Sequence, residues 1–294
     1  MLPDEVTLSV CMIAYNHGEY IGQAIESIVS QHTDFRFELI ISDDVSSDNT
    51  RDICKLYEER FPDKIRLVFR EQNLGICRNF FETLSLAKGK YVAVCEGDDY
   101  WIDNYKLQKQ KEYLDNHPAA SFVYHNAIVQ TGREKRLFIS LNTEEHIVGT
   151  EELLSKWAIP TASIVFRRSA FFIPAPFKVF TNADYYLELL LHSKGEIHYV
   201  PSIMSVYRRH EGSASEFLDK DKSGLYEGLK ELLQHCRQFY SSSEQIFFQK
   251  AIDRYDQKKL SEERKSRFPF LKYLDWRFYK RTLFKKLRIA RTRG

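Results

Sequence analysis

Three carboxylates, Glu96, Asp98 and Asp99, stand around one glycine directly after a short apolar run at residues 91–95. The run is rich in β-branched and aromatic residues, which predicts a buried strand with the acids at its carboxyl end. In open α/β sheets, ligands bind at that edge. Neighbouring carboxylates repel one another unless a cation or a hydroxyl-rich ligand neutralises them, and their oxygens suit Mg²⁺ or Mn²⁺, which bridge phosphate oxygens. We therefore interpret the segment as a divalent-cation site, with a solvated acidic turn as the alternative.

Two earlier polar turns also follow predicted strands. Tyr15 and Asn16 come after the apolar residues 7–14, and Asp44 comes soon after the apolar residues 35–42. Parallel strands point the same way, so the turns that follow them meet at one edge of the sheet. The sequence thus predicts one site built from three turns.

The elements that must position these turns alternate between strand and helix patterns. We expect strands at 7–14, 35–42, 65–69 and 91–95, and helices at 20–31, 46–60 and 75–88, the second of them capped within residues 46–48. Short loops join these elements. This first part of the chain therefore predicts an α/β fold with a parallel, doubly wound sheet.

Later residues continue the alternation less regularly. Helices are expected at 105–116, 150–157 and 183–193, and strands at 120–129, 133–140, 163–166, 197–200 and 204–207. Two helical stretches, 225–240 and 245–260, precede a basic tail. The whole pattern predicts a mostly parallel, Rossmann-like sheet flanked by helices, followed by a helical extension.

The composition predicts a well-formed core and reduced thiols. Of 294 residues, 43% are hydrophobic, and no stretch approaches the ~20 apolar residues that a membrane span needs. The first residues lack the pattern of a secretory signal. The five cysteines are scattered and never in Cys-x-x-Cys spacing, which argues against disulfides and against a zinc site. We expect a cytoplasmic protein.

The tail at residues 265–293 carries eleven lysines and arginines and one acid, Asp275. Its aromatic and aliphatic residues recur three or four positions apart, as on one face of an amphipathic helix. This pattern favours peripheral binding to an anionic membrane surface, at the inner face of the cell membrane; docking of the tail on the rest of the protein is the alternative. Nucleic-acid binding is not expected, because the basic excess is confined to one end of the chain.

Four sequence motifs stand in order along the chain. They read SVCMIAYNHGEYIGQAIESIVSQ, ELIISDDVSSDNT, EQNLGICRNFFETLSLAKGKYVAVCEGDDYW and ADYYLELLLHSKGEIHYVPSIMSVYRRHEGSAS. Over residues 6–215 the chain therefore resembles the family 2 glycosyltransferases, which have the GT-A fold and use a nucleotide-diphosphate sugar. It departs from the family at Ile13 and Ala14, where Pro-Thr is common, and at Glu96, where the family usually has Asp.

The resemblance implies a donor and metal site at the sheet edge. Tyr15 would stack on the base, and Asp44 would accept a hydrogen bond from a uracil-type imide; a helix N-cap is the alternative for Asp44. Asp98 is preferred to Asp99 as the direct metal ligand, with His210 as a further ligand of the metal or the diphosphate. The expected donor-binding residues are Ala14, Tyr15, Asn16, Asp44, Asn73, Gly75, Arg78, Glu96 and Asp98.

The resemblance also places a general base in the second half of the chain. Asp184, near the start of the helix expected at 183–193, fits that position, because displacement at a sugar's anomeric carbon needs a carboxylate that takes the acceptor's proton. An Asp that only stabilises the helix dipole is the alternative, and Glu188, one turn on, is the next candidate base. Thr161 would line the acceptor site or be an ordinary strand residue, and Arg208 could bind phosphate.

These motifs imply a catalytic domain at 1–218, with a nucleotide-binding half at 1–103 and an acceptor half at 104–218, and a C-terminal extension at 219–294. The expected activity is an inverting, metal-dependent transfer of a hexosyl or N-acetylhexosaminyl group to a glycan or lipid-linked acceptor in surface-polysaccharide synthesis. Asp44 and the resemblance favour UDP. A catalytically inactive protein that binds sugar nucleotides or glycans is the alternative. An NAD enzyme is disfavoured, since no Gly-x-Gly-x-x-Gly follows the first strand.

Overall fold

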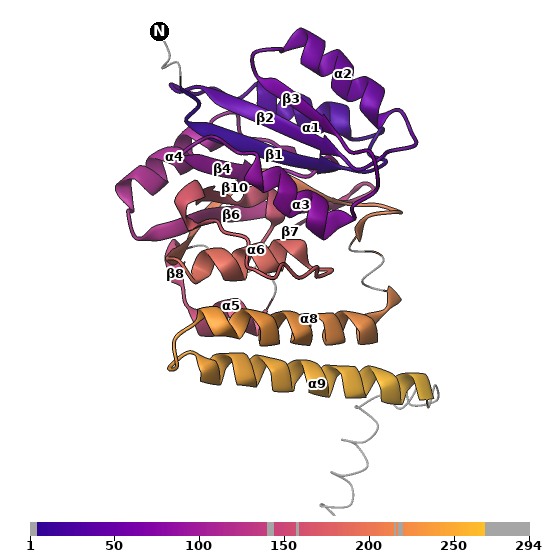
Figure 1. Ribbon diagram of the computed structural model, residues 1–294, viewed down its shortest axis with the longest axis vertical. Coiled ribbons are helices and arrows are strands. Elements are labelled where there is room, and N and C mark those ends of the chain that lie inside the picture. The colour runs from indigo at the N-terminus through magenta and orange to yellow at the C-terminus, as the bar shows by residue number, and fades with distance from the viewer. Residues whose placement is uncertain (1–4, 140–143, 157–158, 215, 217–219, 268–294) are drawn as a thin grey trace, which may run out of the picture.

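The computed structural model describes residues 5–139, 144–156, 159–214, 216 and 220–267 (Figure 1). Within these ranges one mixed sheet has the strand order β3-β2-β1-β4-β9-β6-β10-β5, with β7 beside β6 and β8 beside β10. The strands are β1 (Leu8–Ala14), β2 (Phe37–Asp43), β3 (Ile65–Phe69), β4 (Tyr91–Val94), β5 (Tyr100–Trp101), β6 (Ala120–Thr131), β7 (Glu134–Leu137), β8 (His146–Val148), β9 (Val165–Arg167) and β10 (Glu196–Arg209).

Helices cover both faces of this sheet. They are α1 (Ile21–Val29), α2 (Thr50–Arg60), α3 (Ile76–Ser85), α4 (Lys106–Asn116), α5 (Thr150–Ser155), α6 (Ala183–His192), α8 (Lys222–Cys236) and α9 (Gln245–Arg267), with single 3-10 turns η1 (Thr161–Ser163), η2 (Arg168–Ala170) and η3 (Arg237–Phe239). Successive side chains of β1 point to opposite faces of the sheet, as they do in any strand. Val10 and Met12 join a buried cluster with Ile25 of α1, whereas Cys11 joins the cluster that contains Phe81 of α3.

The first part of the chain folds as the sequence predicts. Strands β3, β2, β1 and β4 are all parallel, and helices connect them in turn. Every side chain of β4 is buried, and so are nearly all of β1 and β2, because helices lie on both faces of the sheet. The carboxyl ends of β1, β2 and β4 therefore lie at one edge.

The second part departs from the predicted boundaries. Residues 197–200 and 204–207 were expected to be two strands, but they form the single strand β10, which runs parallel to β6 with register shifts between Val200 and Ser205. Pro201 lies at this irregularity, where a residue without an N–H group is tolerated. Strand β9 is antiparallel to both β4 and β6. The short strands β5 and β8 were not predicted, because two or three residues are too few to show an alternation of apolar and polar side chains.

Helix α2 begins at Thr50, so the prediction that it starts within residues 46–48 is wrong. The serines there bind a neighbouring turn instead, as described below. At the other end of the chain, α8 and α9 pack beneath α6 (Figure 1). Leu232 of α8 and Phe248 of α9 belong to the same buried cluster as Leu190 of α6. The predicted amphipathic tail lies almost wholly outside the described residues.

Two expectations from composition can be compared with the structure. The five cysteines are all buried and unpaired, as their spacing indicated. No helix within the described ranges combines the length and apolar character that crossing a membrane requires.

Gly89, in the bend before β4, allows a close contact between two backbone segments. A Cβ at this position would lie 2.6 Å from the Ser9 nitrogen and 2.7 Å from the Leu8 Cα. We predict that Gly89→Ala lowers the free energy of unfolding by about 1–3 kcal/mol, because backbone atoms have to move. Gly228→Ala on α8 is the matched control, since nothing lies within 4 Å of its new methyl group. It should stabilise the protein by about 0.5–1 kcal/mol through helix propensity. Urea unfolding measures both free energies, and equal effects of the two substitutions would contradict these predictions.

Candidate active site

The turn after β1 is hydrogen-bonded to the turn after β2. The backbone N–H of Asn16 donates to Ser46 Oγ at 2.8 Å, and Asn16 Oδ1 accepts from the Ser47 N–H at 2.8 Å. Asn16 has φ +56°, a left-handed conformation that asparagine tolerates. The carbonyl of Ala14 accepts from the Asp44 N–H at 2.9 Å. These bonds occupy the serines that had been expected to cap α2.

Asp44 shapes the loop before α3. Its two carboxylate oxygens accept the N–H groups of Leu74 at 2.8 Å and Gly75 at 2.9 Å. Asn73 Nδ2 donates to the Asp44 carbonyl at 3.0 Å. Gly75 has φ +76°, which favours glycine, and it is the N-cap of α3. Asp44 is therefore no helix N-cap, and its carboxylate fixes the loop that carries two other expected donor-binding residues.

Two expected donor-binding side chains face solvent beside this loop. Tyr15 is 49% exposed, so its ring is accessible to a planar group. Arg78 is exposed in the first turn of α3. The amino-terminal end of α3 carries the positive end of the helix dipole, which favours anions.

The acidic loop after β4 is held against β10. Asp99 is buried and accepts the backbone N–H of Arg208 at 2.8 Å. The Arg208 guanidinium donates to the Asp98 carbonyl at 2.7 Å and to Gln23, and it lies 4.2 Å from the Tyr100 ring centroid. Arg208, expected at a phosphate, thus contacts the loop itself and Gln23 of α1. Asp99 serves the loop structurally, which leaves the carboxylate of Asp98 facing the site.

Asp98 lies between two histidines. His210 Nε2 is 3.2 Å and His17 Nε2 is 3.8 Å from Asp98 Oδ2. Burial alone would raise the pKa of Asp98, but His17 and the hydrogen bond to His210 outweigh burial and hold the pKa below its usual value. The hydrogen bond to Asp98 in turn raises the pKa of His210. His17 was not among the predicted site residues, although it follows Asn16 in the first turn.

Gly97 explains how the first turn and the acidic loop come so close. A Cβ at Gly97 would lie 2.8 Å from His17 Nδ1 and 3.3 Å from Ala14 Cβ. A larger residue would push the two loops apart. The glycine between Glu96 and Asp98 is therefore part of the site's geometry.

Glu96 and Asp184 bring the two halves of the chain together. Burial, and then the nearby charges of Asp98, Asp99 and Asp184, raise the pKa of Glu96 well above its usual value. Asp184 lies in the first turn of α6, and Thr161 Oγ1 donates to its Oδ2 at 3.3 Å. The predicted base thus stands near the predicted metal loop, with the predicted acceptor-side Thr161 in contact with it.

Glu188 differs from Asp184 although both lie on α6. It is fully buried, and neither of its carboxyl oxygens has a hydrogen-bond partner in the described part of the chain. Burial, followed by the charge of Asp184, raises the pKa of Glu188 well above its usual value. Glu188 is thus closed off from solvent, whereas Asp184 is partly exposed and bonded to Thr161, so burial favours Asp184 over Glu188 as a base.

This site can hold a divalent cation only when a bound ligand supplies further oxygen atoms to the cation. Among the described residues, no group of three or more His, Cys, Asp or Glu side chains is arranged to hold a metal ion. Mg²⁺, however, is commonly bound by one or two carboxylates together with substrate phosphates. Asp98, with His210 beside it, offers a donor set of that kind. Asp99 does not, because it is buried against Arg208.

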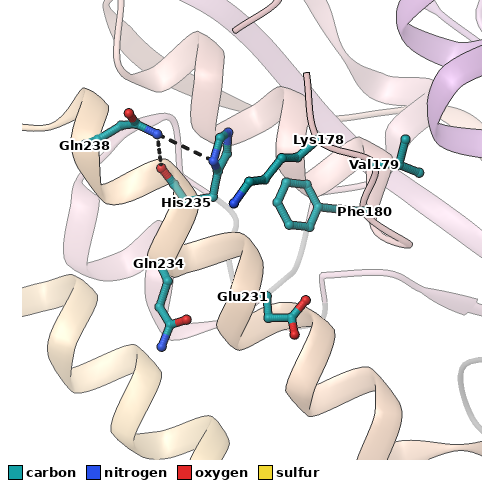
Figure 2. Close-up of a pocket in the computed structure, with 7 residues that line it drawn as sticks. All are labelled: Lys178, Val179, Phe180, Glu231, Gln234, His235 and Gln238. Carbon is teal, nitrogen blue, oxygen red and sulfur yellow. Dashed lines mark hydrogen bonds between the residues drawn. The ribbon is translucent and has the colours of Figure 1, made fainter. Parts of the chain in front are cut away.

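A polar pocket of about 570 Å³ lies between α8 and the segment that leads into α6 (Figure 2). It is lined by Lys178, Val179 and Phe180 from that segment and by Glu231, Gln234, His235 and Gln238 from α8. His235 Nε2 lies 3.0 Å from the hydroxyl of Tyr186 on α6. Amide, carboxyl and ammonium groups of this kind can bind a ligand rich in hydroxyl groups.

The sequence of this chain matches a family of known proteins. The family described as "Glycosyl transferase family 2" matches residues 9–209. The uncharacterized protein Rv1520 of Mycobacterium tuberculosis is 39% identical over 205 residues, which are 69% of this chain and 59% of that protein. The Bacillus subtilis protein named "Putative teichuronic acid biosynthesis glycosyltransferase TuaG" is 36% identical over 135 residues, 45% of this chain and 52% of that protein. The chain thus spans little more than half the length of these relatives.

Solved structures share the fold. S. aureus TarS 1-349 in complex with UDP superposes with a TM-score of 0.65 and 17% identity, covering 87% of this chain and 72% of that one. The same protein in complex with UDP-GlcNAc gives a TM-score of 0.63 at 17% identity, over 86% of this chain and 81% of that one. This likeness confirms the expected GT-A fold.

Proposed function

The chain belongs to glycosyl transferase family 2, and on this premise we propose that it is an inverting, metal-dependent glycosyltransferase that uses a UDP-linked hexose or N-acetylhexosamine. The observation that carries the proposal is that Asp184, in the first turn of α6, lies close enough to Glu96 at the end of β4 for its charge to raise the pKa of Glu96. A carboxylate from the second half thereby faces the metal and donor loop of the first half, as direct displacement requires.

The donor would bind across the first two turns and the loop before α3. Tyr15 offers an exposed ring for the base, and the backbone around Asn73 and Gly75 lies beside the positive end of α3. Glu96 would bind the ribose hydroxyls, and Asp98 would hold the diphosphate-bound cation. That TarS has been solved with UDP and with UDP-GlcNAc supports the choice of UDP.

Transfer would proceed in one displacement. Asp184 takes the proton of the acceptor hydroxyl as the oxygen forms a bond to the anomeric carbon, and the bond from that carbon to the diphosphate oxygen breaks on the opposite face. Thr161 holds one oxygen of Asp184, which orients the carboxylate. Bound to Asp98 and His210, the cation would offset the charge that develops on the leaving diphosphate.

The acceptor is proposed to be a glycan or a lipid-linked glycan of surface-polysaccharide synthesis. The name of TuaG, a relative in teichuronic acid biosynthesis, supports this class. In this proposal residues 1–103 bind the nucleotide, 104–218 bind the acceptor, and 219–294 form the extension. The alternative, a protein that binds sugar nucleotides without transfer, predicts no turnover of a labelled UDP-sugar with any glycan acceptor.

Donor binding should depend on a divalent cation, because Asp98 would otherwise face the diphosphate with like charge. Calorimetry with UDP in Mn²⁺ and then in EDTA should show affinity falling at least about tenfold when the cation is removed. Asp98→Asn should also weaken UDP binding in the presence of Mn²⁺, and Glu96→Gln should weaken it less. Equal affinities with Mn²⁺ and with EDTA would rule out the metal role.

Asp184→Asn should lower transfer by at least ~100-fold, the lower end of what a positioned base contributes, and leave UDP affinity intact. Glu188→Gln is the matched control on the same helix. Because its raised pKa favours the neutral acid, an amide of the same shape should leave kcat near the wild-type value. Near-normal kcat in Asp184→Asn, or a larger loss in Glu188→Gln, would place the base elsewhere.

The basic tail is proposed to hold the enzyme at an anionic membrane surface, near a lipid-linked acceptor. Each Lys or Arg close to such a surface contributes ~1 kcal/mol, and salt screens this attraction. The chain should co-sediment with vesicles that contain phosphatidylserine at low salt, but not at high salt and not with phosphatidylcholine alone. Truncation before Lys265 should abolish binding. A truncated protein that still sediments with the anionic vesicles would refute the proposal.

A further inference from the structure

Lys106, the first residue of α4, is buried in an unusual way. Its side chain is fully buried, and its Nζ has no hydrogen-bond partner among the described residues. The Nζ atom lies 4.1 Å from the centroid of the Trp101 ring. An unpaired ammonium group is costly to bury, whereas an apolar residue of similar length would fill the same space without that penalty. The lysine therefore requires an explanation other than packing.

The groups that face Lys106 do not balance its charge locally. Burial lowers the pKa of Lys106 to about 7, while Cys95 and Asp103 act in the opposite direction. Burial raises the pKa of the Cys95 thiol well above its usual value, and burial lowers that of His125 on β6 well below. Asp103 is ionised but pairs with Lys109 at 2.6 Å. Among Lys106 and the groups that face it, Lys106 is the one whose charge changes near neutral pH.

Trp101 connects the acidic loop to the turn beside Asp184. It lies two residues after Asp99 and pairs with Ser205 of β10. Its backbone N–H donates to Ser27 Oγ of α1 at 3.1 Å, and its indole Nε1–H donates to the Ala162 carbonyl at 2.9 Å. Ala162 follows Thr161, whose hydroxyl donates to Asp184. The orientation of the indole thus influences the distance between the acidic loop and Asp184.

We propose that Lys106 is a positioning residue for sugar transfer, whose ammonium group on the Trp101 ring fixes the indole that links the carboxylate loop to the Thr161–Asp184 pair. This inference rests on the proposed function, because it concerns the geometry of the proposed base. A cation over the face of an indole is attracted by the ring's negative face, and the attraction is strongest away from water. Lys106 therefore acts on the carboxylate loop and on Asp184 through Trp101.

The first arm of the test compares stability. Because the pKa of Lys106 lies below the unfolded-state value near 10.4, the unfolded chain binds more protons between about pH 7 and pH 10. The fold should therefore gain stability from this group as pH rises through that range. Lys106→Met should have an unchanged or higher Tm at pH 7 and should lose this part of the pH dependence. Lys111→Met, also on α4 but paired with Asp115 at 2.9 Å, is the matched control and should retain it.

The second arm observes Trp101 directly. The chain has three tryptophans, so a ¹H–¹⁵N spectrum contains three indole signals, and Trp101→Phe identifies the one from Trp101. In the wild type and in Lys111→Met this signal should shift with pH, with a midpoint near the pKa of Lys106, about 7. In Lys106→Met it should not shift. A pH-independent Trp101 signal in the wild type would overturn the proposal, because Lys106 would then not act on the indole.

The third arm measures transfer from a UDP-sugar. Lys106→Met should lower kcat about tenfold, as misplacement of reacting groups does, with UDP affinity within about twofold of the wild type. An unchanged kcat, or a loss that matches a fall in Tm, would overturn the positioning role alone. A wild-type chain that binds UDP but transfers no sugar would overturn the proposed function, and the positioning role with it. The outcomes are therefore distinguishable.

Discussion

Mutual repulsion among the carboxylates at the end of β4 is the constraint on which the rest of this structure depends. Each of the three carboxylates is accommodated in a different way. Asp99 is buried against the Arg208 N–H, Asp98 lies between His17 and His210, and Glu96 has a pKa raised well above its usual value. Of the three, only Asp98 thus combines a lowered pKa with a partly exposed side chain. The loops around it are arranged to keep that one charge in place.

The same constraint explains why the site needs both halves of the chain. The acidic loop is too short to stabilise itself, so β5 and β10 hold it from one side and the first turn holds it from the other. Arg208 is central to this arrangement, because its backbone and its guanidinium bind adjacent residues of the loop. Helix α6 then adds Asp184, α8 packs against α6, and α9 packs against α8.

Much of the fold could be predicted from the sequence. The parallel strands of the first part are apolar runs separated by helical periods, and they appear where those patterns place them. The second part was harder to predict, because β10 continues through Pro201 and because β9 reverses direction between β4 and β6. Pairing direction is set by which strand lies next to which, and a local pattern does not contain that information.

The sequence by itself determined the chemical types at the site and their order along the chain: a tyrosine-asparagine turn, Asp44, the three acids around Gly97 and, much later, Asp184. Local periodicity and turn residues suffice for the turns and acids at the strand ends, since each strand end is defined by its own neighbours, whereas the resemblance to the family indicated Asp184. Only the tertiary structure decided that Asp99 supports the loop while Asp98 faces the site, that Asp44 holds the Asn73–Gly75 loop, and that His17 belongs beside His210. The decisive bond joins Asp99 to Arg208, 109 positions away, and a contact at that separation leaves no local pattern to read.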